Sequence, residues 1–84
     1  MDCDYTVHSA VAREMASLSR REQERLLTIF SRLADNPFLR GDREQRDAIG
    51  QRLEVRRFGR WMAVYWADHP VKEVRIIDVE RVTA

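Results

Sequence analysis

Apolar residues recur at helical spacing through the first part of the chain. Val11, Met15 and Leu18 stand at i, i+4 and i+7, which predicts a helix over residues 9–18 with Ser9 as its N-cap. Ser19 and Glu22 have the spacing of a capping box and predict the start of a second helix. That helix is expected to end at Asn36-Pro37, because proline excludes helical geometry at the preceding residue. The two helices should form a hairpin with one shared apolar side.

The spacing changes from helical to alternating after Gly50. Leu53 and Val55 alternate with charged residues, which predicts a strand with one buried and one solvated face. Strands over residues 61–67 and 71–82 are expected to follow, after turns at residues 58–60 and 68–70. Residues 38–50 are rich in charged side chains, with Gly41 near the start of the segment and Gly50 at its end. A loop or a ragged turn of helix is therefore expected there.

With a further short strand over residues 4–8, the expected order is β-α-α-β-β-β. Strands joined by short turns pair antiparallel, and the helix hairpin should cover one face of that sheet. The sequence therefore predicts a single α+β domain over residues 1–84, an antiparallel sheet packed against a helix hairpin.

The strand over residues 61–67 is apolar on both faces. The side chains of one face are Trp61, Ala63 and Tyr65, and those of the other are Met62, Val64 and Trp66. A strand apolar on both sides is typical of a sheet covered on both sides, and the helices supply only one layer. The second face is left for a partner chain, a ligand or an oligomer contact, or for long arginine side chains that fold over it.

Composition places the chain among globular proteins, because 44% of its residues are hydrophobic and 35% are charged. The formal net charge is only +1, and Lys72 is the only lysine beside fourteen arginines. Residues 40–60 hold seven of these arginines and four acidic residues, so the excess positive charge gathers in one internal segment.

The strand that begins this meander carries Arg52, Glu54 and Arg56 on one face. Two interpretations stay open from the residues alone. One is an ion-pair ladder on a solvated strand, worth less than about 1 kcal/mol per pair. The other is a phosphate-binding surface, because guanidinium forks match phosphate oxygens and Glu54 could accept a proton from a hydroxyl.

The whole chain resembles the RelE/ParE toxin superfamily, the toxic halves of bacterial type II toxin–antitoxin pairs. The resemblance covers nearly the full length in the same element order, and no single segment is a diagnostic motif. The segments that carry it include residues 5–7, 12–18, 33–37, 52–56, 59–61, 64–65 and 74–79. It implies a sheet backed by a helix hairpin, with a cognate antitoxin as partner. A homodimer or a toxin–antitoxin hetero-oligomer is the implied assembly.

RelE-type members cut mRNA in the ribosomal A site, without a metal or cofactor, by aligning a ribose 2′-hydroxyl for attack on its own phosphate. The resemblance implies endoribonuclease activity with ribosome and mRNA as partners. Arg52, Arg56 and Arg81 are the candidates for stabilising the phosphate, and Glu54 is the candidate proton acceptor. The residues expected to contact RNA are Arg57, Arg60 and Trp66.

Two departures from the RelE pattern keep an alternative open. Met62 stands where RelE-type enzymes commonly carry an arginine, and the sequence ends at Ala84, before the stretch that often supplies a catalytic tyrosine or histidine. ParE-type toxins poison DNA gyrase without nuclease residues. The alternative is therefore a gyrase poison, or a degenerate member that acts only by binding its antitoxin.

The remaining residues indicate a cytoplasmic protein that needs no metal. Cys3 is the only cysteine, and the acidic residues 1–4 are unlike the start of a signal peptide. The longest apolar run, residues 61–67, is far shorter than the about 20 residues of a membrane helix. His8 and His69 have no further cysteine or histidine at ligand spacing, so no zinc site is expected.

Overall fold

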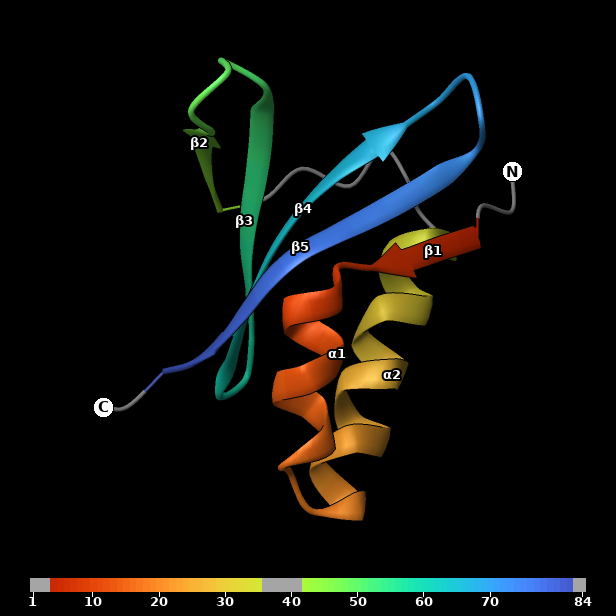
Figure 1. The fold of residues 1–84 in the computed structure, drawn as a ribbon, viewed down its shortest axis with the longest axis vertical. Helices are drawn as coiled ribbons and strands as arrows, with labels where there is room; N and C mark the ends of the chain where they lie inside the picture. The colour runs from red at the N-terminus through yellow and green to blue at the C-terminus, as the bar shows by residue number, and fades with distance from the viewer. Residues whose placement is uncertain (1–3, 36–41, 83–84) are drawn as a thin grey trace.

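A computed structural model describes residues 4–35 and 42–82 of the chain. Two helices and a five-stranded sheet make up this part of the molecule (Figure 1). The elements follow one another as β1 (Asp4–Val7), α1 (Ser9–Ala16), α2 (Arg20–Asp35), β2 (Arg43–Arg46), β3 (Arg52–Phe58), β4 (Trp61–Asp68) and β5 (Glu73–Arg81). The predicted α+β class and the helix hairpin beside a sheet are confirmed.

The sheet has the order β1-β5-β4-β3-β2. The meander β3-β4-β5 is antiparallel, as the short turns require. The N-terminal strand β1 pairs parallel to β5, so the prediction of a wholly antiparallel sheet is wrong at this edge. Figure 1 shows β1 beside β5 at the edge of the sheet, with the two helices directly after β1 along the chain.

Both helices begin close to the predicted residues. The cap of α1 is His8 rather than Ser9, because the His8 Nδ1 atom accepts a hydrogen bond from the Ala10 N–H at 3.1 Å. Before α2, the Ser19 hydroxyl accepts from the Glu22 N–H at 3.2 Å, which is one half of the predicted capping box. Asn36-Pro37, expected to end this helix, lies outside the described residues.

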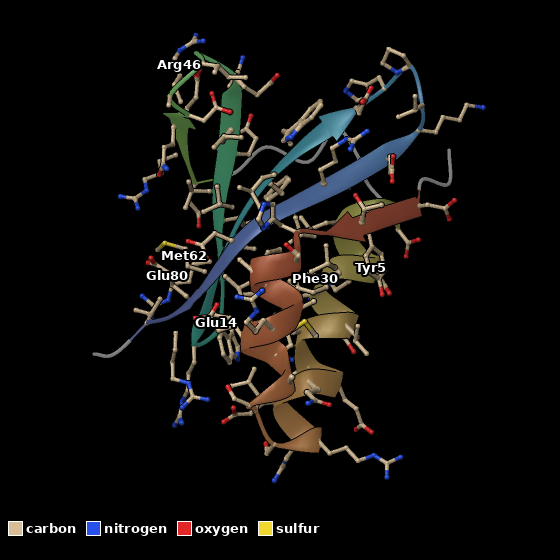
Figure 2. The ribbon with its side chains drawn as sticks, viewed as in Figure 1. Tyr5, Glu14, Phe30, Arg46, Met62 and Glu80 are labelled. Atoms are coloured by element: carbon tan, nitrogen blue, oxygen red, sulfur yellow. The ribbon has the colours of Figure 1, made fainter. Side chains whose placement is uncertain are left out.

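The core lies between the helices and one face of the sheet. Its largest fully buried side chain is Phe30, which packs its ring 5.7 Å from that of Tyr5 on β1 (Figure 2). The other buried residues of this cluster come from both layers: Val11, Leu26, Ile29 and Leu33 from the helices, and Phe58, Trp61, Ala63, Tyr65, Val74, Ile76 and Val79 from the sheet. The helical stripe read from the sequence is thus the face that packs on the strands.

The strand β2 corrects the expectation of a loop or helical turn within residues 38–50. Its residues Arg43–Arg46 pair antiparallel with β3, and all four side chains are exposed. An edge strand of charged residues is a known way to keep a sheet from pairing with other chains. The segment has no apolar alternation, which is why the sequence pattern did not indicate a strand.

Candidate functional site

The arginine row of β3 lies on the same face of the sheet as the helix-packed core. Glu54 pairs with Tyr65 and Arg56 with Ala63 in the β3–β4 register, and paired residues point to the same side. Leu53 and Val55 are buried as predicted, but they face the opposite side. The row is therefore the continuation of the helix-side face toward β2.

Arg52 stands at the centre of an ion-pair network on this face. Its Nε atom lies 3.3 Å from Glu44 Oε1 and its Nη2 atom 3.4 Å from Glu54 Oε1. Glu44 also contacts Arg46 at 3.7 Å, and Figure 2 shows Arg46 near the turn that joins β2 to β3. The Arg52–Glu54 pair of the ladder read from the sequence is thus present, and Glu44 extends it onto β2. Because the Arg52 and Glu44 side chains are about half exposed, each pair is weak and an incoming phosphate can compete for the guanidinium.

Arg56 is the next residue of the row and lies over the ring of Phe58, 5.4 Å from its centroid. Arg32 of α2 approaches the same ring at 6.0 Å. Two guanidiniums, one from each layer, therefore meet at one aromatic ring. Arg32 carried no site role in the sequence analysis, because its position beside β3 depends on how the helix docks on the sheet.

Tyr65 lies on β4, level with Glu54 of the row, and is 3% exposed. Burial raises the pKa of Tyr65 to about 12; the carboxylates of Glu54 and Asp42 add to this, and Arg56 opposes it. The phenol is therefore neutral at physiological pH, next to Glu54 in the strand register. Neither Tyr65 nor Glu44 was among the predicted site residues, because their proximity follows only from the strand register.

Arg81 lies apart from the rest of the row. It pairs with Trp61, and Trp61 pairs with Phe58, so Arg81 stands level with the end of β3. Arg52 is six residues earlier on β3, about 20 Å along the strand. The Arg81 guanidinium lies over the Trp61 ring at 5.1 Å and forms an ion pair with Glu22 of α2. The structure does not bring Arg81 together with Arg52.

The three residues expected to contact RNA do not share a surface. Arg60 is exposed in the β3–β4 turn beside α2. Arg57 points to the opposite side of the sheet, because it pairs with Met62, and its Nε atom donates to the Gly59 carbonyl at 2.9 Å. Trp66 is also on that side, with the guanidinium of Arg75 over its ring at 5.4 Å.

No model of a protein family matches the sequence, and no curated protein matches it. Solved structures do match. The toxin–antitoxin complex RelBE2 of Mycobacterium tuberculosis superposes with a TM-score of 0.79 at 18% identity, over 96% of this chain and 92% of that one. The RelE–RelB complex of Pyrococcus horikoshii gives 0.73 at 19% identity, over 96% of each chain. Isolated Escherichia coli RelE gives 0.73 at 14% identity, over 98% and 86%.

The chain has the fold of the RelE toxins. The resemblance read from the sequence is confirmed at this level, and its nearly full-length extent agrees with the coverage of all three structures. Identities below 20% leave the site residues to be judged on their own geometry.

On this RelE fold, the sheet face turned away from the helices carries the second apolar row of β4. Met62, Val64 and Trp66 are each partly exposed, whereas Trp61, Ala63 and Tyr65 are buried against the helices. Of the two rows that the sequence left open, the row that includes Met62 is the partly exposed one, although Leu53 and Val55 on the same face of β3 are buried. Polar side chains flank this row. Arg43 Nη2 lies 3.8 Å from Met62 Sδ, and Glu80 of β5 pairs with Met62 in the β4–β5 register (Figure 2).

The described part of the chain has neither a metal-ligand cluster nor a helix suited to cross a membrane. Residues 4–35 and 42–82 contain no group of three or more histidine, cysteine or acidic side chains arranged to hold a metal ion. His8 serves as the cap of α1, and His69 lies exposed in the β4–β5 turn. Neither described helix is long and apolar enough to cross a membrane.

Proposed function

We propose that this chain is the toxin of a toxin–antitoxin pair and that it cleaves mRNA on the ribosome. The observation that carries the proposal is the row Arg52–Glu54–Arg56 on the helix-side face of a RelE fold, in which Arg52 is exposed and Glu54 and Arg56 are partly exposed. Fold alone does not assign an activity, so the proposal depends on the chemistry that this row can perform.

The row supplies the groups that cleavage by a ribose 2′-hydroxyl requires. Arg52 and Arg56 flank Glu54 on one face, and their guanidiniums can stabilise the charge that develops on the phosphate. Glu54 can accept the proton of the 2′-hydroxyl, whose oxygen then bonds to the adjacent phosphorus as the bond from phosphorus to the 5′-oxygen of the next nucleotide breaks. The 5′-oxygen takes a proton from water and leaves as a hydroxyl. Arg81, held at the end of β5 and apart from the row, is proposed as a cation for a more distant phosphate of the same RNA strand.

Tyr65 can assist this chemistry without changing its own charge. Its phenol is neutral, buried and directly across from Glu54, so it can fix the orientation of the carboxylate as a hydrogen-bond donor. The substrate phosphate would take over one of the contacts that Arg52 makes with Glu44 and Glu54. The ion-pair ladder then represents the resting arrangement of the proposed site.

The partly exposed apolar row of β4 on the face turned away from the helices is proposed as the surface for the antitoxin. Two of the similar structures are RelE–RelB or RelBE complexes, so proteins of this fold assemble with an antitoxin. Met62, Val64 and Trp66 offer a partly exposed apolar row, and burial of apolar area is the main driving force for stable association. Cytoplasmic action on ribosomes follows from the same proposal.

Expression in cells without the antitoxin tests the nuclease proposal. We expect growth arrest, loss of translation and new mRNA ends within coding sequence from the wild-type chain. The double variant Arg52→Gln and Arg56→Gln should lose all three effects, because the charge on the phosphate is no longer stabilised. Arg43→Gln is the matched control, since it removes an equal charge per site from the opposite face of the sheet. Unchanged mRNA ends in arrested cells would reject the nuclease proposal.

A second candidate function is binding without cleavage, and two contacts favour it. Arg52 and Arg81 both contact carboxylates of this chain, and Met62 occupies the position where RelE-type enzymes commonly have an arginine. DNA damage with intact mRNA in the same experiment would indicate a gyrase poison. A folded chain that binds an antitoxin and harms no cells would indicate a member that acts only through its partner.

A further inference from the structure

A pocket of about 400 Å³ lies between α2 and the turn that joins β3 to β4. Trp61 forms its apolar side, and Thr28 faces it from the helix. Four arginines from three elements surround the opening: Arg21 and Arg25 from α2, Arg60 from the turn, and Arg81 from β5. The pocket is distinct from the row on β3, none of whose residues lines it.

Among the described residues, three of these four arginines form no ion pair with a carboxylate. Arg81 is paired with Glu22, and Glu24, the other acidic residue at the pocket, contacts Arg20 outside it at 3.4 Å. Within residues 4–35 and 42–82, Arg21, Arg25 and Arg60 form no ion pair. The opening therefore presents three guanidiniums that are available to an anionic ligand.

The walls of the pocket are held in place by contacts between the layers. The Arg25 guanidinium lies against the turn, with its Nη2 atom 3.4 Å from the position that a Cβ atom on Gly59 would occupy. The indole of Trp61 is 8% exposed and is covered on one face by Arg81. Helix, turn and strand end are thus joined around a preformed cavity that combines an apolar wall with a cationic rim.

We propose that this pocket binds an acidic peptide segment that places an apolar side chain against Trp61 and carboxylates on Arg21, Arg25 and Arg60. The apolar wall and the separate cations match a chain in which acidic and apolar residues alternate. An RNA strand fits less well, because it carries a charge at every nucleotide and would bring phosphates against Glu22 and Glu24. The inference goes beyond the proposed nuclease function and holds whether or not the chain cuts RNA.

Fluorescence of Trp61 provides the test. In a Trp66→Phe background Trp61 is the only tryptophan, so its emission reports on the pocket. The probe is a synthetic eight-residue peptide of alternating glutamate and leucine, and we expect a saturable change in emission on titration. Arg21→Gln and Arg25→Gln should each weaken binding about three- to tenfold, in line with the loss of a charge-assisted contact at a partly exposed site.

Matched controls separate the pocket from general charge attraction. Arg13→Gln removes the same charge from α1, away from the pocket, and should bind the peptide like the parent. A lysine–leucine peptide should not bind. Circular dichroism verifies that each variant is folded, which the exposed positions of Arg21 and Arg25 favour. Absence of saturable binding to the parent, equal weakening by Arg13→Gln, or tighter binding of an eight-nucleotide oligouridylate than of the acidic peptide would each overturn the proposal.

Discussion

Glu54 and Tyr65 lie directly opposite each other in the β3–β4 register, on the face of the sheet that the helices cover further along. This pairing places the partly exposed carboxylate of Glu54 beside the buried phenol of Tyr65. It also shows that the charged row of β3 and the β4 row of Trp61, Ala63 and Tyr65 are two parts of one surface. The proposed chemistry depends on that shared surface.

Substitution of Tyr65 by phenylalanine should change how stability depends on alkaline pH. Burial, with a contribution from Glu54, raises the pKa of Tyr65 to about 12 in the folded chain, whereas an unfolded tyrosine titrates near 10. The contribution of Tyr65 to the free energy of unfolding is fully present below pH 10. It is lost as the pH rises toward 12, because in this range the unfolded chain releases the phenol proton and the folded chain keeps it. Relative to Tyr65→Phe, the wild type should lose about 2 to 3 kcal/mol over this range.

Urea denaturation of both proteins between pH 8 and the highest pH at which each folds reversibly measures this difference. All other titrating groups are shared by the two proteins, so they cancel to first order. A constant difference in the free energy of unfolding across the range would show that the Tyr65 phenol ionises as readily in the folded chain as in the unfolded one.

The core of the fold should depend far more on Phe30 than on Leu27, an exposed residue of the same helix. Phe30 is fully buried between the helices and the sheet, so Phe30→Ala should lower the free energy of unfolding by about 3 to 5 kcal/mol. Leu27 is 43% exposed on the same helix, and Leu27→Ala should cost less than about 1 kcal/mol. Chemical denaturation at neutral pH compares the two, and equal losses would contradict the packing described above.

The ion pair between Glu22 and Arg81 links α2 to the last strand. Because the two side chains are 36% and 47% exposed, Glu22→Gln should lower the free energy of unfolding by less than about 1 kcal/mol, and less at high salt. Glu24→Gln is the control, since its pair with Arg20 is more exposed and stays within one helix. Denaturation midpoints in low and high salt measure both variants, and a salt-independent loss for Glu22→Gln would show that a different contact was removed.

Much of this fold could be predicted from the spacing of apolar residues. The helix hairpin and the antiparallel meander follow from periodicity and from glycine and proline at the turns, because these signals are local. The strand β2 and the parallel pairing of β1 could not be predicted in this way. An edge strand of charged residues has no apolar alternation, and the partner of a strand distant in sequence is set by tertiary packing.

The candidate site was predictable only where it lies within one strand. Alternation along β3 placed Arg52, Glu54 and Arg56 on one face, and the structure has them there. The same reasoning could not show that this face is the helix side, that Tyr65 lies opposite Glu54, or that Arg81 is held elsewhere by Glu22. Each of these relationships depends on how separate elements dock. The spacing of residues within one element does not predict that docking.

The central claim is that the row on β3 cleaves mRNA on the ribosome. Its most direct test uses purified chain, ribosomes stalled on a defined mRNA with an empty A site, and mapping of the new mRNA ends. The wild type should cut within the A-site codon and leave the same mRNA intact without ribosomes. The Arg52→Gln and Arg56→Gln double variant should cut at least about 100-fold more slowly. Intact mRNA with a folded wild-type chain, or equal cutting by the double variant, would contradict the claim.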